Sequence, residues 1–254
     1  MKSFRLVMLV AVLGLAGFTA SAAPIVTGTP NGGEPELYTI YNSIYGTNFT
    51  AADDPNFLAL QTGMETLTID PDVESISFDA LWRQAYLTDT IGFYTPSQSK
   101  MALNMTNVLG PFDNNTPGFG QGPIVMDPVT IDATGLGVIG FYDHAALPTD
   151  PNVYFDWFSE AYLNNGQYQT TDNEIHVLIL TTPYADTYLL CFEDLPYTYL
   201  VDGAAKQQDI GDQDYQDVLV QITLNRTVIP EPTSMALLGF GLATVAYRRF
   251  RKKA

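Results

Sequence analysis

The sequence predicts a mainly β protein: a β-sandwich or jelly-roll-like domain after one short amphipathic helix, with a signal helix at the N-terminus and a transmembrane helix at the C-terminus. Two observations favour this class. Beyond residue 64, short runs rich in β-branched and aromatic residues are separated by clusters of Gly, Pro, Asn and Asp. The last runs alternate with a period of two, as strands with one buried face do. No internal repeat of about 20 to 50 residues is present.

The element expected before the β region is a helix. Its apolar residues recur at helical spacing, with Pro35 near the start and Gly46 just after the end: Leu37, Ile40, Tyr41, Ile44 and Tyr45. We therefore expect residues 23–64 to form a helical segment of the mature protein and residues 65–229 to form the β domain.

Nine runs are expected to be strands: residues 65–70, 74–78, 90–95, 124–131, 137–142, 153–158, 174–182, 187–193 and 218–228. Residues 110–118, rich in Gly, Pro and Asn, are expected to be a loop. In the last run, one face carries four apolar side chains: Val218, Val220, Ile222 and Leu224. That face is predicted to pack inward.

The N-terminus is typical of a secretory signal peptide. Lys2 and Arg5 precede an apolar run over residues 6–18, and the small residues Ala20 and Ala22 supply a cleavage site. Signal peptidase is expected to cut after Ala22 or one residue later. The alternative is a retained membrane helix, but the run is short for a bilayer span.

The C-terminus combines a short motif, a hydrophobic span and a basic cluster. The stretch 229–247 contains one charge, Glu231, and has about the length of a membrane-spanning helix. The basic cluster at the C-terminal end should remain in the cytoplasm, so the large region that precedes the span is expected to face outward. The alternative is an amphipathic helix that ends a soluble fold, but residues 235–247 carry no polar stripe. The residues at issue are Pro230, Glu231, Pro232, Arg248, Arg249, Arg251, Lys252 and Lys253.

This order of Pro-Glu-Pro, apolar helix and Arg-rich end resembles the PEP-CTERM sorting signal of Gram-negative bacteria. The resemblance implies recognition by an exosortase, with cleavage near the motif. It also implies anchoring in the inner membrane during transit, then residence at the cell surface or in the exopolysaccharide matrix of a biofilm.

Composition limits the partners. Between the two terminal segments there are 27 acidic residues and four basic ones, which gives this region a net charge near −23. Such a field repels nucleic acid and anionic lipid and attracts cations. The low charge content and 12% aromatic residues argue against disorder. Cys191 is the single cysteine, so no internal disulfide can form, and it is expected to be a buried, inert thiol.

Five acidic residues flank the last two expected strands: Glu193, Asp194, Asp212, Asp214 and Asp217. If these strands are neighbours, both acidic groups lie at the same end of the sheet. Carboxylates gathered this closely need neutralising, and Ca²⁺, with six to eight oxygen ligands in irregular geometry, suits them better than Mg²⁺. The spacing is not that of an EF-hand, because Asp217 occupies the place of its glycine. The alternative is a solvated acidic loop, since Asp is common in turns.

The segments around these acids, Phe192-Glu193-Asp194-Leu195 and residues 211–218, are similar to the C-terminal signature of the DUF4114 family. Residues 173–177 and 91–94 resemble weaker parts of that pattern, so the likeness spans roughly residues 75–225. Gln213 and Gln216 depart from it, where Arg and Asn are usual. The resemblance implies an exported domain without an assigned activity.

These features favour a non-catalytic surface protein that binds Ca²⁺. The alternative is a module that binds exopolysaccharide through exposed aromatic side chains, for which Trp82, Trp157, Tyr197 and Tyr199 are candidates. A glycoside hydrolase is less favoured, because any pair can be chosen among so many acids. His176 is expected to be structural and His144 to lie in a turn. The sequence contains no His-Glu-x-x-His or Gly-x-Ser-x-Gly motif.

Overall fold

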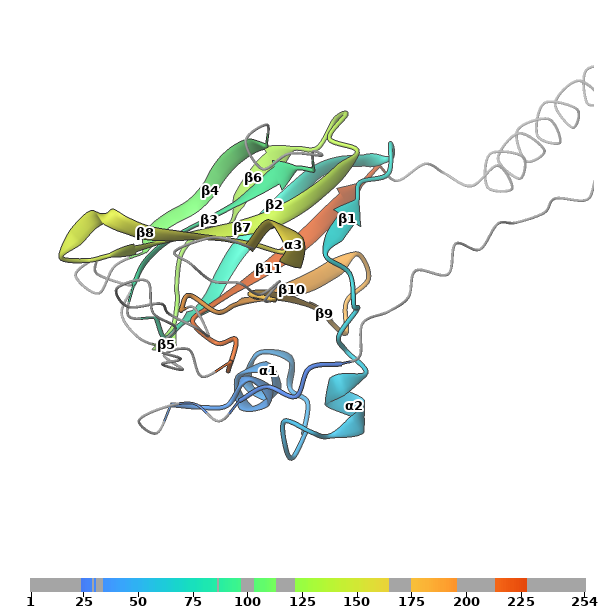
Figure 1. Cartoon of the computed structure of the whole chain (residues 1–254). Helices are drawn as coiled ribbons and strands as arrows, with labels where there is room; N and C mark the ends of the chain where they lie inside the picture. The colour runs from blue at the N-terminus through green and yellow to red at the C-terminus, as the bar shows by residue number, and fades with distance from the viewer. Residues whose placement is uncertain are drawn as a thin grey trace, which may run out of the picture.

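The computed structural model describes residues 24–28, 30, 34–85, 87–96, 103–112, 122–164, 175–195 and 213–227. These residues form two antiparallel sheets that face each other, with the helices of residues 37–45 and 55–58 at one side (Figure 1). Within the described part of the chain, the sheets do not close into a barrel. The prediction of a mainly β fold is confirmed.

The first sheet, called sheet I, has the strand order β1-β7-β3-β4, and β8 pairs with β7. Its centre is the pair of β3 and β7, in which Phe93 lies opposite Phe141. The strands are β1 (Thr66–Thr68), β3 (Thr88–Thr95), β4 (Asn104–Phe112), β7 (Val138–Leu147) and β8 (Asp150–Phe158).

The second sheet, sheet II, has the order β5-β2-β11-β10-β9, and β6 pairs with β2. Its strands are β2 (Val73–Arg83), β5 (Gly122–Pro123), β6 (Val129–Asp132), β9 (Val177–Thr181), β10 (Thr187–Phe192) and β11 (Val218–Arg226). The strand β11 therefore lies between β2 and β10, although it follows β10 in the sequence and is far from β2.

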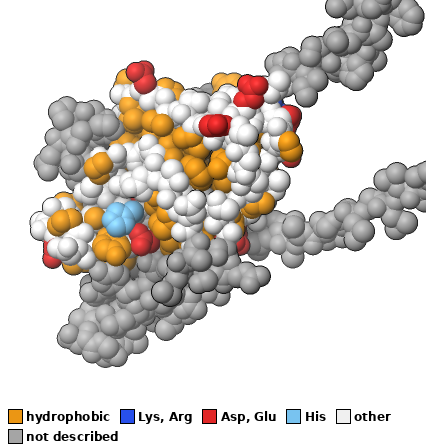
Figure 2. Space-filling model, turned by 90° about the horizontal axis from the view of Figure 1, so that it is seen from above, with side chains coloured by type: hydrophobic (Ala, Val, Ile, Leu, Met, Phe, Trp, Pro, Cys, Tyr) orange, Lys and Arg blue, Asp and Glu red, His pale blue; other side chains and the backbone are white. Residues whose placement is uncertain are grey.

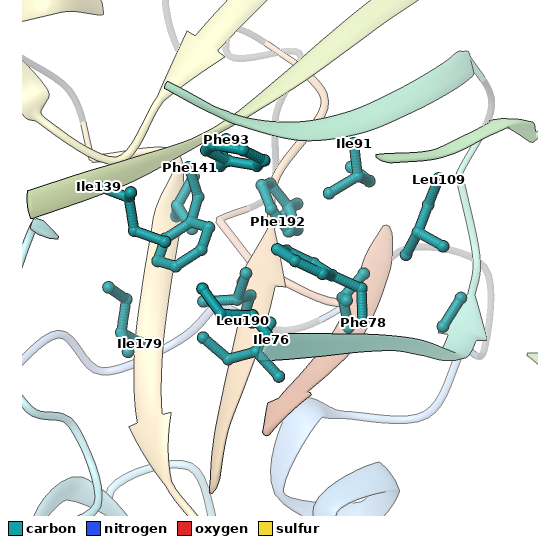
Figure 3. Packing of buried hydrophobic residues seen from close by; sticks show 14 of the residues in the cluster. Ile76, Phe78, Ile91, Phe93, Leu109, Ile139, Phe141, Ile179, Leu190 and Phe192 are labelled. Atoms are coloured by element: carbon teal, nitrogen blue, oxygen red, sulfur yellow. The ribbon is translucent and has the colours of Figure 1, made fainter. Parts of the chain in front are cut away.

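The main core lies between the two sheets and is built by alternate residues of each strand. Phe93 and Phe141 of sheet I meet Phe78 and Phe192 of sheet II in one cluster (Figure 3). As the period of two predicts, the four apolar residues Val218, Val220, Ile222 and Leu224 all belong to this cluster.

The helices are α1 (Leu37–Tyr45), α2 (Pro55–Leu58) and α3 (Ala161–Asn164). The expected helix is α1, and it ends at Gly46, whose left-handed φ of 67° suits glycine. Leu37 and Tyr41 bury the apolar stripe of α1 in a second cluster, together with Leu219, which points away from the main core. Sheet II is therefore covered on both faces, by sheet I and by the N-terminal segment.

Three expectations are wrong in detail. Residues 124–131 do not form one strand, because the short β5 ends at Pro123 and β6 begins only at Val129. The strand β4 was not expected, because Gly110 and Pro111 lie within it and predict a loop. It nevertheless pairs with β3, from Asn104 opposite Thr95 to Phe112 opposite Asp89. His144 lies inside β7 rather than in a turn.

The predicted signal peptide, with Ala20 and Ala22, and the predicted C-terminal span lie outside the described residues, so both remain predictions. In the part of the chain that is described, no helix combines the length and the apolar character needed to cross a membrane.

Candidate functional site

Acidic side chains gather where β10 ends and β11 begins. The pairing of Phe192 with Val218 places Glu193 and Asp194 beside Asp217. One carboxylate oxygen from each of these three residues lies within 4.8 Å of the other two. Glu193 and Asp194 are buried, so the alternative of a solvated acidic loop is wrong for these two.

The backbone holds this trio in place. The amide of Asp194 donates a hydrogen bond to Oδ2 of Asp217 at 2.7 Å, and the amide of Asp217 donates to the carbonyl of Phe192 at 3.2 Å. The amide of Glu193 donates to the carbonyl of His176 at 3.0 Å. These hydrogen bonds join the end of β10, the start of β11 and the residue before β9. The backbone therefore places the three carboxylates near one another.

An aromatic stack supports the trio from sheet I. Trp157 of β8 stacks on His176 with ring centroids 3.6 Å apart, and its indole nitrogen donates to the carbonyl of Asp194 at 2.8 Å. Nδ1 of His176 lies 3.1 Å from the carbonyl of Glu193. Both rings are buried, so His176 is a structural histidine, as expected.

Of the other two predicted ligands, Asp212 lies outside the described residues. Asp214 is buried but turns toward Gln216, whose amide and side-chain nitrogen donate to its carboxylate at 3.2 and 2.8 Å. Its neighbours Gln213 and Tyr215 have left-handed φ values of 60° and 57°. Asp214 therefore lies near the trio, but its carboxylate does not contribute to the group of three close oxygens.

Sequence reasoning missed a second group of buried charges, which comes mainly from sheet I. Nε of Arg83 donates to Oδ2 of Asp89 at 3.1 Å, and a terminal nitrogen of Arg83 donates to the carbonyl of Leu87. The amide of Leu87 donates to Oδ2 of Asp194 at 3.2 Å, which joins this group to the trio. Asp143 of β7 is also fully buried.

A signal for Asp143 was present in the sequence. Ile139, Phe141 and Ala145 occupy the same face of β7 and are buried, so a carboxylate at position 143 must point inward as well. An acid in the inward register of an apolar strand is costly without a partner, which makes it a candidate for function.

The electrostatics reflect burial and crowding. Burial raises the pKa of Asp217, and the negative charges of Asp194 and Glu193 raise it further. Burial likewise raises the pKa values of Asp89 and Asp143, and Asp194 adds to both, whereas Arg83 opposes the shift. The site therefore favours either protons or a cation among its carboxylates.

The surface looks different. On the face shown in Figure 2, acidic side chains are scattered among hydrophobic ones. The three close carboxylates lie at one end of the two sheets, where Glu193 and Asp194 are buried and Asp217 is partly exposed. All three close donors are carboxylate oxygens, a set that suits a hard cation such as Ca²⁺ better than a soft transition metal.

Several sequence candidates do not form an exposed site. Trp157 is buried, so it offers no surface for the alternative of sugar stacking, and Trp82 is only partly exposed. Tyr197 and Tyr199 lie outside the described residues. Cys191 is buried as expected, and burial raises the pKa of its thiol, which suppresses reactivity.

The clearest likeness to known proteins lies in the C-terminal segment, which carries the sorting sequence of an exported class of proteins. Residues 228–252 match the PEP-CTERM protein-sorting motif. The motif indicates export and membrane-associated sorting through the exosortase pathway, with exosortase as the processing partner. No curated protein and no solved structure matches the chain.

Proposed function

We propose that this chain is a non-catalytic protein of the bacterial cell surface or exopolysaccharide matrix, whose β domain is stabilised by Ca²⁺ held at Glu193, Asp194 and Asp217. The observation that carries the cation part is the approach of three carboxylate oxygens to within 4.8 Å, two of them from buried residues. Uncompensated carboxylates this close repel strongly in a low-dielectric interior, and a divalent cation removes that cost.

The surface location is supported by the sorting motif at residues 228–252. Exosortase processing should leave a mature C-terminus near Pro230. Mass spectrometry of the protein released by an exosortase-producing host tests this, with a variant whose Pro230, Glu231 and Pro232 are replaced by alanine as control. A wild-type protein that retains Ala254 in that host would contradict processing.

The non-catalytic part is supported by how the residues with nucleophilic or basic side chains are engaged. Nδ1 of His144 lies 2.7 Å from Oδ1 of Asp156, and His176 is buried under Trp157. The thiol of Cys191 is buried among apolar residues. The resemblance of residues 75–225 to the DUF4114 family stays a prediction. It is consistent with an exported domain without an assigned activity.

Calcium binding is tested on the full-length chain in detergent by calorimetric titration, with the melting temperature recorded in Ca²⁺ and in chelator. We expect binding with a rise in melting temperature, because a ligand that binds only the folded state stabilises it. Asp217→Asn should weaken both effects, whereas Asp127→Asn, which removes the same charge from an exposed side chain, should leave them unchanged. No heat and no thermal shift at millimolar Ca²⁺ would remove the cation from the proposal.

A further inference from the structure

We propose that Asp143 of sheet I is a further acidic ligand of the cation site, so that the bound Ca²⁺ ties the two sheets together from inside the protein. This inference rests on the proposed function, and it adds a residue from the facing sheet to a site otherwise built by sheet II. The occupant remains a divalent cation with a preference for oxygen ligands.

The first support is the condition of the Asp143 side chain. The residue has no exposed surface, and neither carboxylate oxygen has a hydrogen-bond partner among the described residues. The amide of Thr90 favours its charged form, but it does not reach hydrogen-bond geometry with either oxygen. A buried carboxylate without a donor is unfavourable when it is charged, because it has lost its hydration and gained no hydrogen bond in return. A bound cation would remove this cost.

The second support is its direction. Asp143 shares the inward face of β7 with Phe141 and Ala145, and it lies opposite Trp157 in the pairing of β7 with β8. The indole of Trp157 reaches across to the carbonyl of Asp194 at 2.8 Å. Asp143 is therefore on the strand face that looks toward Asp194.

The third support is the pairing of the nearby cation. Arg83 is fully buried, and its Nε lies 3.1 Å from Oδ2 of Asp89. The guanidinium thereby compensates Asp89, while Asp143 receives no hydrogen bond from it. One guanidinium cannot balance the three carboxylates of Asp89, Asp143 and Asp194. A divalent ion between Asp194 and Asp143 would offset two of the excess negative charges in this interior region.

Asp194 is the residue of the site that is hydrogen-bonded toward both sheets. Its amide donates to Asp217 within sheet II, and its Oδ2 accepts from Leu87, which precedes β3 of sheet I. A cation that shares Asp194 with Glu193 and Asp217 on one side and with Asp143 on the other joins both sheets at the end where their strands meet this residue.

The test is calorimetric titration of the full-length chain in detergent with CaCl₂, for wild type, Asp143→Asn and the matched control Asp127→Asn. We expect the control to bind as wild type does. We expect Asp143→Asn to bind Ca²⁺ at least about tenfold more weakly, because ligand charge sets affinity at such sites. A variant Asp143→Asn that binds with wild-type affinity overturns this inference and leaves the proposed function intact. A wild-type protein that binds no Ca²⁺ overturns both.

A second measurement requires no substitution and covers the case in which the variant does not fold. Hydrogen exchange of the wild-type chain is compared in Ca²⁺ and in chelator. If the ion joins the sheets, the amides of β7 around Asp143 gain protection together with those around Asp194 and Asp217. Protection that appears around Asp194 and Asp217 but not in β7 contradicts the role of Asp143.

Discussion

The indole nitrogen of Trp157 donates a hydrogen bond to the backbone carbonyl of Asp194 at 2.8 Å. This bond links β8 of sheet I to the residues that follow β10 of sheet II. It also fixes the peptide that carries one of the three close carboxylates, so the packing of the two sheets and the geometry of the acidic site depend on each other.

Trp157→Phe should therefore destabilise the protein and loosen the site. The change leaves a buried carbonyl without its donor and opens a cavity, with a combined cost of about 2–4 kcal/mol. Urea unfolding measures this loss. Trp82→Phe is the matched control, because Trp82 is only partly buried and should lose less than half as much. Equal losses for the two variants would show that the Trp157 bond has no special weight.

Arg83→Met should be more damaging than most single changes in this chain. Arg83 and Asp89 are both fully buried, and removing one partner leaves the other charge uncompensated at a cost of about 3–5 kcal/mol. The double variant Arg83→Met with Asp89→Asn should recover much of that loss, since it removes both charges. Chemical denaturation of the wild type, both single variants and the double variant measures the coupling; additive losses would contradict it.

Gly92→Ala should cost stability through crowding on sheet I. A Cβ atom at this position would lie 2.6 Å from the ring of Tyr142 and would also meet the carbonyl of Thr106. Overpacking of this kind typically costs about 1–3 kcal/mol. Thermal unfolding measures the effect, and Thr68→Ala, at an exposed position of β1, serves as control. A melting temperature equal to that of the control would show that the neighbours move aside.

The protein should lose stability in alkali as tyrosines ionise. Burial raises the pKa of Tyr41 to about 12, and its hydroxyl donates to the carbonyl of Thr181 at 2.9 Å. The folded state then holds this proton more tightly than the unfolded state, whose pKa is about 10. The contribution is complete below pH 10 and disappears as the pH rises toward 12.

Tyr41→Phe provides the check on that prediction. At neutral pH it should cost about 1 kcal/mol for the lost hydrogen bond. Between pH 10 and 12 the variant should lose less stability than the wild type does, as measured by denaturant midpoints across that range. Parallel pH profiles for the two proteins would contradict the assignment to Tyr41.

Periodicity predicted the parts of the fold in which packing decides the structure. The helix α1 and the face of β11 follow from apolar spacing, because each buries one side against a neighbour. The strand from residue 104 was missed because Gly110 and Pro111 resemble a turn. Among the described strands, β4 pairs with β3 alone, and such an edge strand tolerates these two residues. The hydrogen bonds to β3 therefore outweigh the local preference of these two residues for a turn.

The acidic site was predicted in part, since the residues after one strand and before the next meet when the two strands pair antiparallel. Glu193, Asp194 and Asp217 were found in this way and do lie together. Asp89 and Asp143 were not, because they come from the facing sheet, and one sequence does not show how two sheets are aligned. The inward register of Asp143 was readable, but its neighbours across the core were not.

The position of β11 has a mechanical consequence for a protein sorted through its C-terminus. This strand is hydrogen-bonded to β2 on one side and β10 on the other, and Arg226 at its end forms ion pairs with Asp70, Asp72 and Asp186. A pull on the segment beyond Thr227 therefore loads a central strand along its length. Detachment requires shearing two ladders of hydrogen bonds at once rather than peeling one edge open, so the β domain is expected to resist a force applied through its C-terminal end.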